Sequence, residues 1–170
     1  KIGAYYFFLE GKERAGIERA VLANTFAQDA FGDGMFRRFA ALVAKQNVYM
    51  DSFTTLAPAE AKAFYRDTVA GSAVRTTERM RATAFEQAGE GGFGIDPEAW
   101  FEAQTAKINK LKAVEDHLAE GLIAELQATA GAARATAWTY LALGLVLIVA
   151  TITAGALLVR TLVAPLEAMV

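Results

Sequence analysis

Residues 137–159 read AWTYLALGLVLIVATITAGALLV, and no charged residue occurs between Arg134 and Arg160. A helix needs about 20 apolar residues to cross the hydrocarbon core of a bilayer, because each residue adds only about 1.5 Å. Trp138 and Tyr140 stand at one end of the stretch, where amphipathic aromatic side chains favour the headgroup layer. A buried core helix is also apolar, but a small soluble core does not cover so long a charge-free run. The stretch therefore predicts a transmembrane helix over residues 137–159.

The sequence before this stretch has the three-and-four spacing of amphipathic helices and no alternating strand pattern. Glycines in FGDG (residues 31–34) and GEGGFG (residues 89–94) break the pattern, as do Gly71 and Ser72. We expect helices over residues 4–31, 35–56, 58–70 and 73–88, and one unbroken helix over residues 97–159. The predicted fold class is all-α, an antiparallel helical bundle continuing into a transmembrane helix.

Apolar side chains at helical spacing predict the buried face of each long helix. On the second helix this face also carries Gln46, and on the last helix Gln104 lies on such a face too. The buried residues expected on the second helix are Phe36, Phe39, Val43, Met50, Phe53 and Ala57. Those expected on the last helix are Phe101, Ile108, Leu111, Leu118 and Leu122.

Composition excludes several classes of function. The sequence has no cysteine, one histidine (His117) and a net charge of −2. Thiol nucleophiles and thiolate metal sites are therefore absent, and no clustered basic face indicates nucleic acid. We find no catalytic motif and no metal-ligand spacing, and we expect His117 at the edge of the fold. The sequence predicts a protein that is not an enzyme and needs no cofactor.

Three arginines share helical faces with apolar residues: Arg14 and Arg19 on the first helix, and Arg81 on the fourth. Arg75 and Arg79 are expected to point to solvent. A guanidinium on a buried face needs an anion, because an unpaired buried charge is costly. One solution is intramolecular, since Glu10 and Glu18 flank Arg14 at salt-bridge spacing. The other is a small planar anion between helices, which a guanidinium fork fits with two parallel hydrogen bonds.

Residues 4–26, AYYFFLEGKERAGIERAVLANTF, carry a family resemblance whose most specific part is KERAGIERA. The segment resembles the nitrate- and nitrite-sensing (NIT) domain of bacterial receptors. Later parts of the sequence fit the same family in the same order, over residues 4–125. These parts are Phe39 to Gln46, the Pro58 turn, Gly71 before Met80-Arg81, Trp100-Phe101, and Thr105 to Glu115.

The resemblance implies an all-helical domain that binds nitrate or nitrite through arginines on different helices. Arg81 matches an arginine position of the family best, and Arg14 and Arg19 compete on the first helix. The segment resembles the C-terminal half of the domain, so we expect an N-terminal half and a first membrane helix before it. Domains of this family are the input domains of chemotaxis receptors, histidine kinases, nucleotide cyclases and diguanylate enzymes.

After the apolar stretch, residues 160–167 read RTLVAPLE, which resembles the opening of a HAMP linker. We therefore expect a periplasmic sensor over residues 1–136, a span of the bacterial inner membrane over 137–159, and the start of a HAMP linker over 160–170. The first helix is apolar on two faces, which favours a homodimer. Two alternatives remain: a sensor for another small anion or organic acid, and a structural dimerisation bundle without a ligand.

Overall fold

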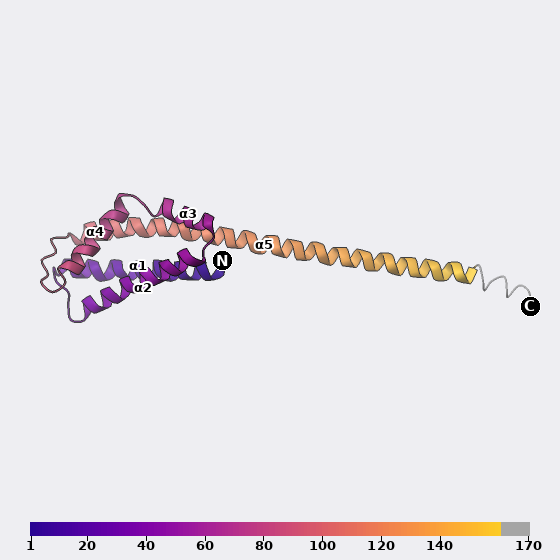
Figure 1. The fold of residues 1–170 in the computed structure, drawn as a ribbon, viewed down its shortest axis with the longest axis horizontal. Coiled ribbons are helices and arrows are strands. Elements are labelled where there is room, and N and C mark those ends of the chain that lie inside the picture. The colour runs from indigo at the N-terminus through magenta and orange to yellow at the C-terminus, as the bar shows by residue number, and fades with distance from the viewer. Residues whose placement is uncertain (161–170) are drawn as a thin grey trace, which may run out of the picture. The chain divides into compact units, whose positions relative to one another are not determined.

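The computed structural model describes residues 1–160. In this range the chain forms α1 (Ile2–Ala27), α2 (Met35–Leu56), α3 (Ala59–Thr68), α4 (Ser72–Glu86) and α5 (Pro97–Leu158), and it forms no strand (Figure 1). The all-α prediction is confirmed. The expected helix boundaries hold to within a few residues. The largest difference is at the end of α1, which stops at Ala27 and not at residue 31.

The chain divides into two compact units, Lys1–Leu122 and Ile123–Val170. The boundary falls inside α5, whose backbone is helical without a break from Pro97 to Leu158. The prediction of one continuous helix is therefore confirmed through Leu158. The domain boundary predicted after residue 136 stays a prediction.

Two hydrophobic clusters form the core of the first unit. α1 contributes its first half to one cluster and its second half to the other, whereas α2 and α5 contribute in the reverse order. α1 is therefore antiparallel to both, and Figure 1 shows α1 and α2 side by side. The first cluster comprises Ala4, Phe8, Ala15, Phe53, Ala57, Ala61, Leu111 and Val114. The second comprises Val21, Leu22, Phe26, Phe39, Val43, Ala84, Phe93 and Trp100.

The two glycine-containing breaks are in contact with each other. Asp29 adopts a left-handed backbone conformation just after α1, with φ of 50°. Its carbonyl oxygen accepts a hydrogen bond from the Gly92 N–H at 2.9 Å, and its carboxylate accepts one from the Phe93 N–H at 2.8 Å. These bonds hold the loop before α5 against the end of α1, with the Phe93 side chain in the core.

The buried face of α5 differs from the predicted one. Phe101, expected in the core, is 45% exposed, and the fully buried aromatic residue is its neighbour Trp100. Ile108 and Leu118 only pack against the first cluster. Gln104 lies on this face as predicted, but the face also includes Lys107, a charged residue that hydrophobic periodicity does not select. The buried residues of α5 are Trp100, Gln104, Lys107, Leu111 and Val114. On α2, Phe36 is likewise more exposed than predicted, at 39%.

The later part of α5 is apolar and uncovered. It contains an 18-residue window with a mean hydropathy of 2.5, and 0% of that window is buried. Among the described residues, α5 is the helix that is long and apolar enough to cross a membrane. The residues after Arg160, on which most of the HAMP resemblance rests, lie outside the described part of the chain.

Candidate functional site

A fully buried carboxylate on α1 joins the helices of the first unit. Glu18 has an exposed fraction of 0%. Arg81 of α4 donates to it from Nε to Oε1 and from Nη2 to Oε2, both at 2.6 Å. This is the two-pronged geometry in which a guanidinium binds a carboxylate most strongly. Arg81 is therefore partly buried with a protein anion already in place.

Two glutamines complete the coordination of this carboxylate. Gln46 of α2 donates from Nε2 to Glu18 Oε2 at 2.6 Å, and its own Oε1 accepts from Arg81 Nη2 at 3.2 Å. Gln104 of α5 donates from Nε2 to the Ala15 carbonyl at 3.1 Å and to Glu18 Oε2 at 3.4 Å. Residues from four helices thus meet at one carboxylate.

Lys107 is the second cation near this carboxylate. Its exposed fraction is 9%. Burial, and then the nearby Arg81 charge, lower the pKa of Lys107 to about 8, while Glu18 and Glu78 act in the opposite direction. We call Glu18, Gln46, Arg81, Gln104 and Lys107 the polar layer. In each helix that supplies both clusters, its residues fall between those of the first and second clusters.

Arg19 lies one residue after Glu18 but has different partners. Its Nη1 donates to Thr105 Oγ1 of α5 at 2.9 Å, and its guanidinium carbon lies 4.5 Å from the centre of the Phe101 ring. Its carbonyl oxygen accepts from Trp100 Nε1 at 3.0 Å. Its Nε is buried and makes no hydrogen bond. Within residues 1–160, Arg19 has no carboxylate partner.

Arg14 lies at a third place, on the other side of α1. It forms an ion pair with Glu10 at 2.5 Å, four residues earlier, and donates to the Glu10 carbonyl at 3.2 Å. Its guanidinium also lies 5.0 Å from the centre of the Tyr49 ring of α2. The predicted pairing of Arg14 with Glu10 is present, whereas Glu18 pairs with Arg81.

The three predicted arginines therefore do not share one set of partners. Sequence spacing missed the pairing of Glu18 with Arg81, because those residues are far apart in the chain. A signal for it was present, since Gln46 and Gln104 were already placed on apolar faces. A buried amide on such a face needs a polar partner.

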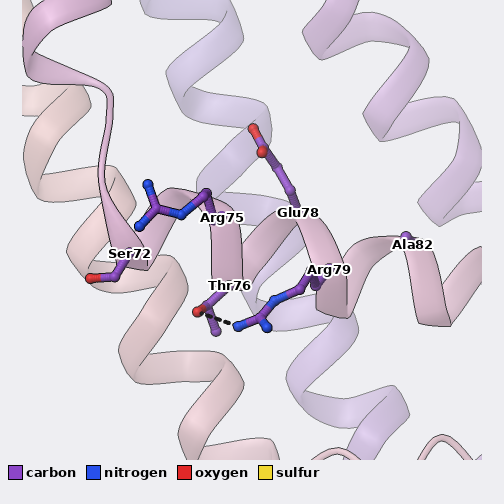
Figure 2. Close-up of a pocket in the computed structure, with 6 residues that line it drawn as sticks. All are labelled: Ser72, Arg75, Thr76, Glu78, Arg79 and Ala82. Carbon is purple, nitrogen blue, oxygen red and sulfur yellow. Dashed lines mark hydrogen bonds between the residues drawn. The ribbon is translucent and has the colours of Figure 1, made fainter.

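An open pocket of about 650 Å³ lies along the exposed side of α4, lined by Ser72, Arg75, Thr76, Glu78, Arg79 and Ala82 (Figure 2). Arg79 donates from Nη2 to Thr76 Oγ1 at 3.1 Å. Arg75 and Arg79 are exposed, as predicted. This pocket holds two guanidinium groups, but both belong to exposed residues, whereas Arg14, Arg19 and Arg81 are partly buried.

The remaining candidates for chemistry are few. His117 stacks on Phe64 with the ring centres 4.0 Å apart and is partly buried at the edge of the first unit. Among residues 1–160, no three His, Cys, Asp or Glu side chains gather where they could hold a metal ion.

Comparison with known proteins gives two findings. The family described as nitrate and nitrite sensing matches residues 1–123. The chain is also 33% identical over 121 residues to the nitrate regulatory protein of Klebsiella oxytoca, a match that covers 71% of this chain and 30% of that protein. No solved structure matches significantly.

Proposed function

Because the chain belongs to the nitrate- and nitrite-sensing family, we propose that residues 1–136 are the input domain of a membrane receptor and bind nitrate or nitrite. The role is signalling and not catalysis. The relative from Klebsiella oxytoca is a regulatory protein that bears nitrate in its name, which supports the same ligand class here.

The observation that carries the proposal is the incomplete pairing of Arg19. Arg81 is bonded to Glu18 and Arg14 to Glu10, so in both a carboxylate occupies the place of an anionic ligand. In Arg19, Nε is buried without a partner and the charge has no counterion within the described residues. An anion at Arg19 would satisfy both needs. We therefore place Arg19 first among the three candidates, with Arg81 and Arg14 behind it.

Nitrate suits such a guanidinium for physical reasons. It is flat and weakly hydrated, and two of its oxygens can accept parallel hydrogen bonds from the guanidinium. Charge-assisted hydrogen bonds contribute about 1.5–3 kcal/mol each, and about 1.4 kcal/mol corresponds to a tenfold change in affinity. Loss of the binding arginine should therefore weaken nitrate binding at least about tenfold.

Calorimetric titration of nitrate into the 170-residue chain in detergent micelles tests the assignment. Arg19→Ala should weaken binding at least about tenfold, with the helical content unchanged. Arg19→Lys should also lose much of the affinity, because an ammonium lacks the planar fork. Arg79→Ala, on the exposed side of α4, is the control and should bind like the parent.

The same titration compares the other candidates. If Arg81→Ala loses nitrate while Arg19→Ala does not, the anion displaces Glu18 from Arg81 and the site is the polar layer. If Arg14→Ala alone loses nitrate, the anion displaces Glu10. Loss in Arg79→Ala would instead place the anion in the pocket of Figure 2.

A second candidate function is a structural dimerisation bundle that binds no small ligand. The two internal ion pairs of Arg14 and Arg81 favour it, because they satisfy those arginines without a ligand. A parent chain that gives no heat with nitrate, nitrite or a panel of carboxylates would decide for this reading. Heat with carboxylates but not nitrate would indicate an organic-acid sensor.

We further propose that α5 crosses the bacterial inner membrane over residues 137–159, with the sensor in the periplasm. Ligand occupancy would then reach a cytoplasmic output through α5, because this helix carries side chains of the site and continues through Leu158 without a break. A parallel homodimer would bring two copies of α5 together. Light scattering in detergent should give the mass of a dimer, and a monomer at micromolar concentration would exclude it.

A further inference from the structure

Three side chains of α5, from two successive turns, contact Arg19. Thr105 accepts from Nη1, the Phe101 ring lies against the guanidinium, and Trp100 donates to the Arg19 carbonyl. Each of these contacts constrains a different part of the residue: the Nη1 end of the side chain, the guanidinium carbon and the backbone. Together, the three contacts hold Arg19 in one orientation without a carboxylate partner among the described residues.

The contacts leave one edge of the guanidinium without a hydrogen bond. Among the described residues, neither Nε nor Nη2 of Arg19 donates to an acceptor. These are the two nitrogens through which Arg81 binds the Glu18 carboxylate. The chain thus contains the same edge twice, once bonded to a planar carboxylate and once, among the described residues, without a hydrogen-bond partner.

We propose that Thr105 and Phe101 are positioning residues that orient this edge of Arg19 and make the site selective for planar anions. The inference rests on the proposed function. Thr105 accepts a hydrogen bond from Nη1 and so fixes the guanidinium, which leaves Nε and Nη2 to donate to the ligand. Phe101 covers one flat face, so that an anion meets the guanidinium in its own plane.

The choice between anion shapes follows from that geometry. Nitrate, nitrite and formate present two oxygens in one plane to the Nε and Nη2 edge. Sulfate and phosphate are tetrahedral, so oxygens outside that plane would approach the Phe101 ring, whose face is electron-rich and repels anions. The ring therefore penalises tetrahedral anions more than planar ones.

The test compares four variants in the 170-residue chain. Thr105→Val removes the acceptor at almost the same volume, and Thr105→Ser restores it. Phe101→Leu removes the aromatic face, and Phe101→Tyr restores it. Ala106→Ser, exposed on the same turn, is the control. Two readouts are taken: affinity for nitrate and sulfate by calorimetry, and nitrogen-15 resonances of the Arg19 side chain, which report rotation of the guanidinium without any ligand.

We expect separate Nη1 and Nη2 resonances in the parent and in Thr105→Ser, and averaged ones in Thr105→Val. Nitrate affinity should fall about threefold to tenfold in Thr105→Val, and the preference for nitrate over sulfate should fall by a similar factor in Phe101→Leu. Thr105→Ser, Phe101→Tyr and the control should behave like the parent.

The two readouts separate this inference from the function on which it rests. If the parent binds nitrate through Arg19 while Thr105→Val and Phe101→Leu keep its affinity and selectivity, the inference is overturned and the function stands. A freely rotating guanidinium in the parent overturns the inference directly. A fixed guanidinium in a parent that binds no planar anion overturns the proposed function, and with it the selectivity assigned to these residues.

Discussion

The charge on Glu18 balances one buried and one partly buried cation, Lys107 and Arg81. Arg81 is bonded to it through both prongs of the guanidinium, and the Glu18 charge also acts on Lys107. A buried ion pair contributes little net stability compared with an apolar pair, but loss of one partner leaves a charge that water cannot reach. The polar layer is therefore sensitive to single substitutions in a way that its hydrogen bonds alone do not indicate.

Glu18→Ala should destabilise the chain by about 3–5 kcal/mol, because it leaves the partly buried Arg81 and the buried Lys107 without their anion. Urea unfolding followed by circular dichroism measures the loss. Glu13→Ala, exposed on the same helix, should change the stability by less than about 0.5 kcal/mol. In the double variant Glu18→Leu with Arg81→Met, most of the stability should return. A double variant as unstable as Glu18→Ala would contradict this account.

Lys107 makes stability depend on pH with a definite sign. The pKa of Lys107 is lowered to about 8 in the folded chain by burial and by Arg81, from a usual value of 10.5. Between these values the unfolded chain binds more protons than the folded one, so stability rises with pH. The penalty of burying the charge is complete below about pH 8 and is relieved above it.

Stability measured from about pH 7.5 to about pH 9.5 should therefore increase by on the order of 1 kcal/mol more in the parent than in Lys107→Met. The methionine keeps the apolar stem and has no proton to lose. The comparison removes the contribution of groups that titrate identically in both chains. Parallel pH profiles would show that Lys107 keeps the same proton affinity in both states.

The sequence predicts ion pairs within one helix better than ion pairs between residues that are far apart in the chain. The pairing of Arg14 with Glu10 follows from a spacing of four residues on one helix. The pairing of Glu18 with Arg81 depends on how α1 and α4 meet, which periodicity does not determine. The incomplete pairing of Arg19 is equally invisible in the sequence, because it depends on which side chains of α5 surround the guanidinium.

Helix ends were predictable for a simpler reason, since Gly, Pro and Asp act through their own backbone geometry. Asp96, the residue before α5, accepts a hydrogen bond from the Ala99 N–H at 3.0 Å, as an N-cap residue does. The buried face of α5 was less predictable, because Gln104 and Lys107 are buried polar residues. Gln104 was expected on this face, whereas Lys107 was not, and a face drawn mainly through apolar residues placed Phe101 in the core.

The contact between the two loops gives a test of element packing. Gly91 has φ of +67°, and an added Cβ would lie 2.5 Å from the Asp29 carbonyl oxygen. Gly91→Ala should destabilise the chain by more than about 1–2 kcal/mol, since a left-handed conformation of alanine already costs that much. Thermal unfolding measures the effect.

Two neighbouring glycines serve as matched controls. Gly92 has φ of +73° but open space around its Cβ position, so Gly92→Ala should show the backbone cost alone. Gly89 has neither feature, and Gly89→Ala should be nearly neutral. Equal losses for Gly91→Ala and Gly92→Ala would mean that the contact with Asp29 does not constrain the loop.

For the whole molecule, the family match ends at residue 123 and the first compact unit ends at Leu122. The family match and the first compact unit thus end at nearly the same residue of α5. The predicted sensor extends to residue 136, because hydropathy detects only where the apolar stretch begins. Residues between these two positions are helical and exposed, which suits a connecting stalk.

The predicted span of α5, over residues 137–159, can be tested by placing a charge at its centre. Residue 148 is the midpoint of the predicted span, and an arginine at the centre of a membrane helix costs about 2.5–3.5 kcal/mol on insertion scales. Ile148→Arg should therefore reduce the membrane-inserted fraction of the chain, measured by carbonate extraction of bacterial membranes. Ala128→Arg lies on α5 before the span and should leave insertion unchanged. Because residue 148 is exposed and belongs to the second unit, urea unfolding of the first unit should be the same in both variants. If Ile148→Arg inserts like the parent, the span lies elsewhere or α5 does not cross the membrane.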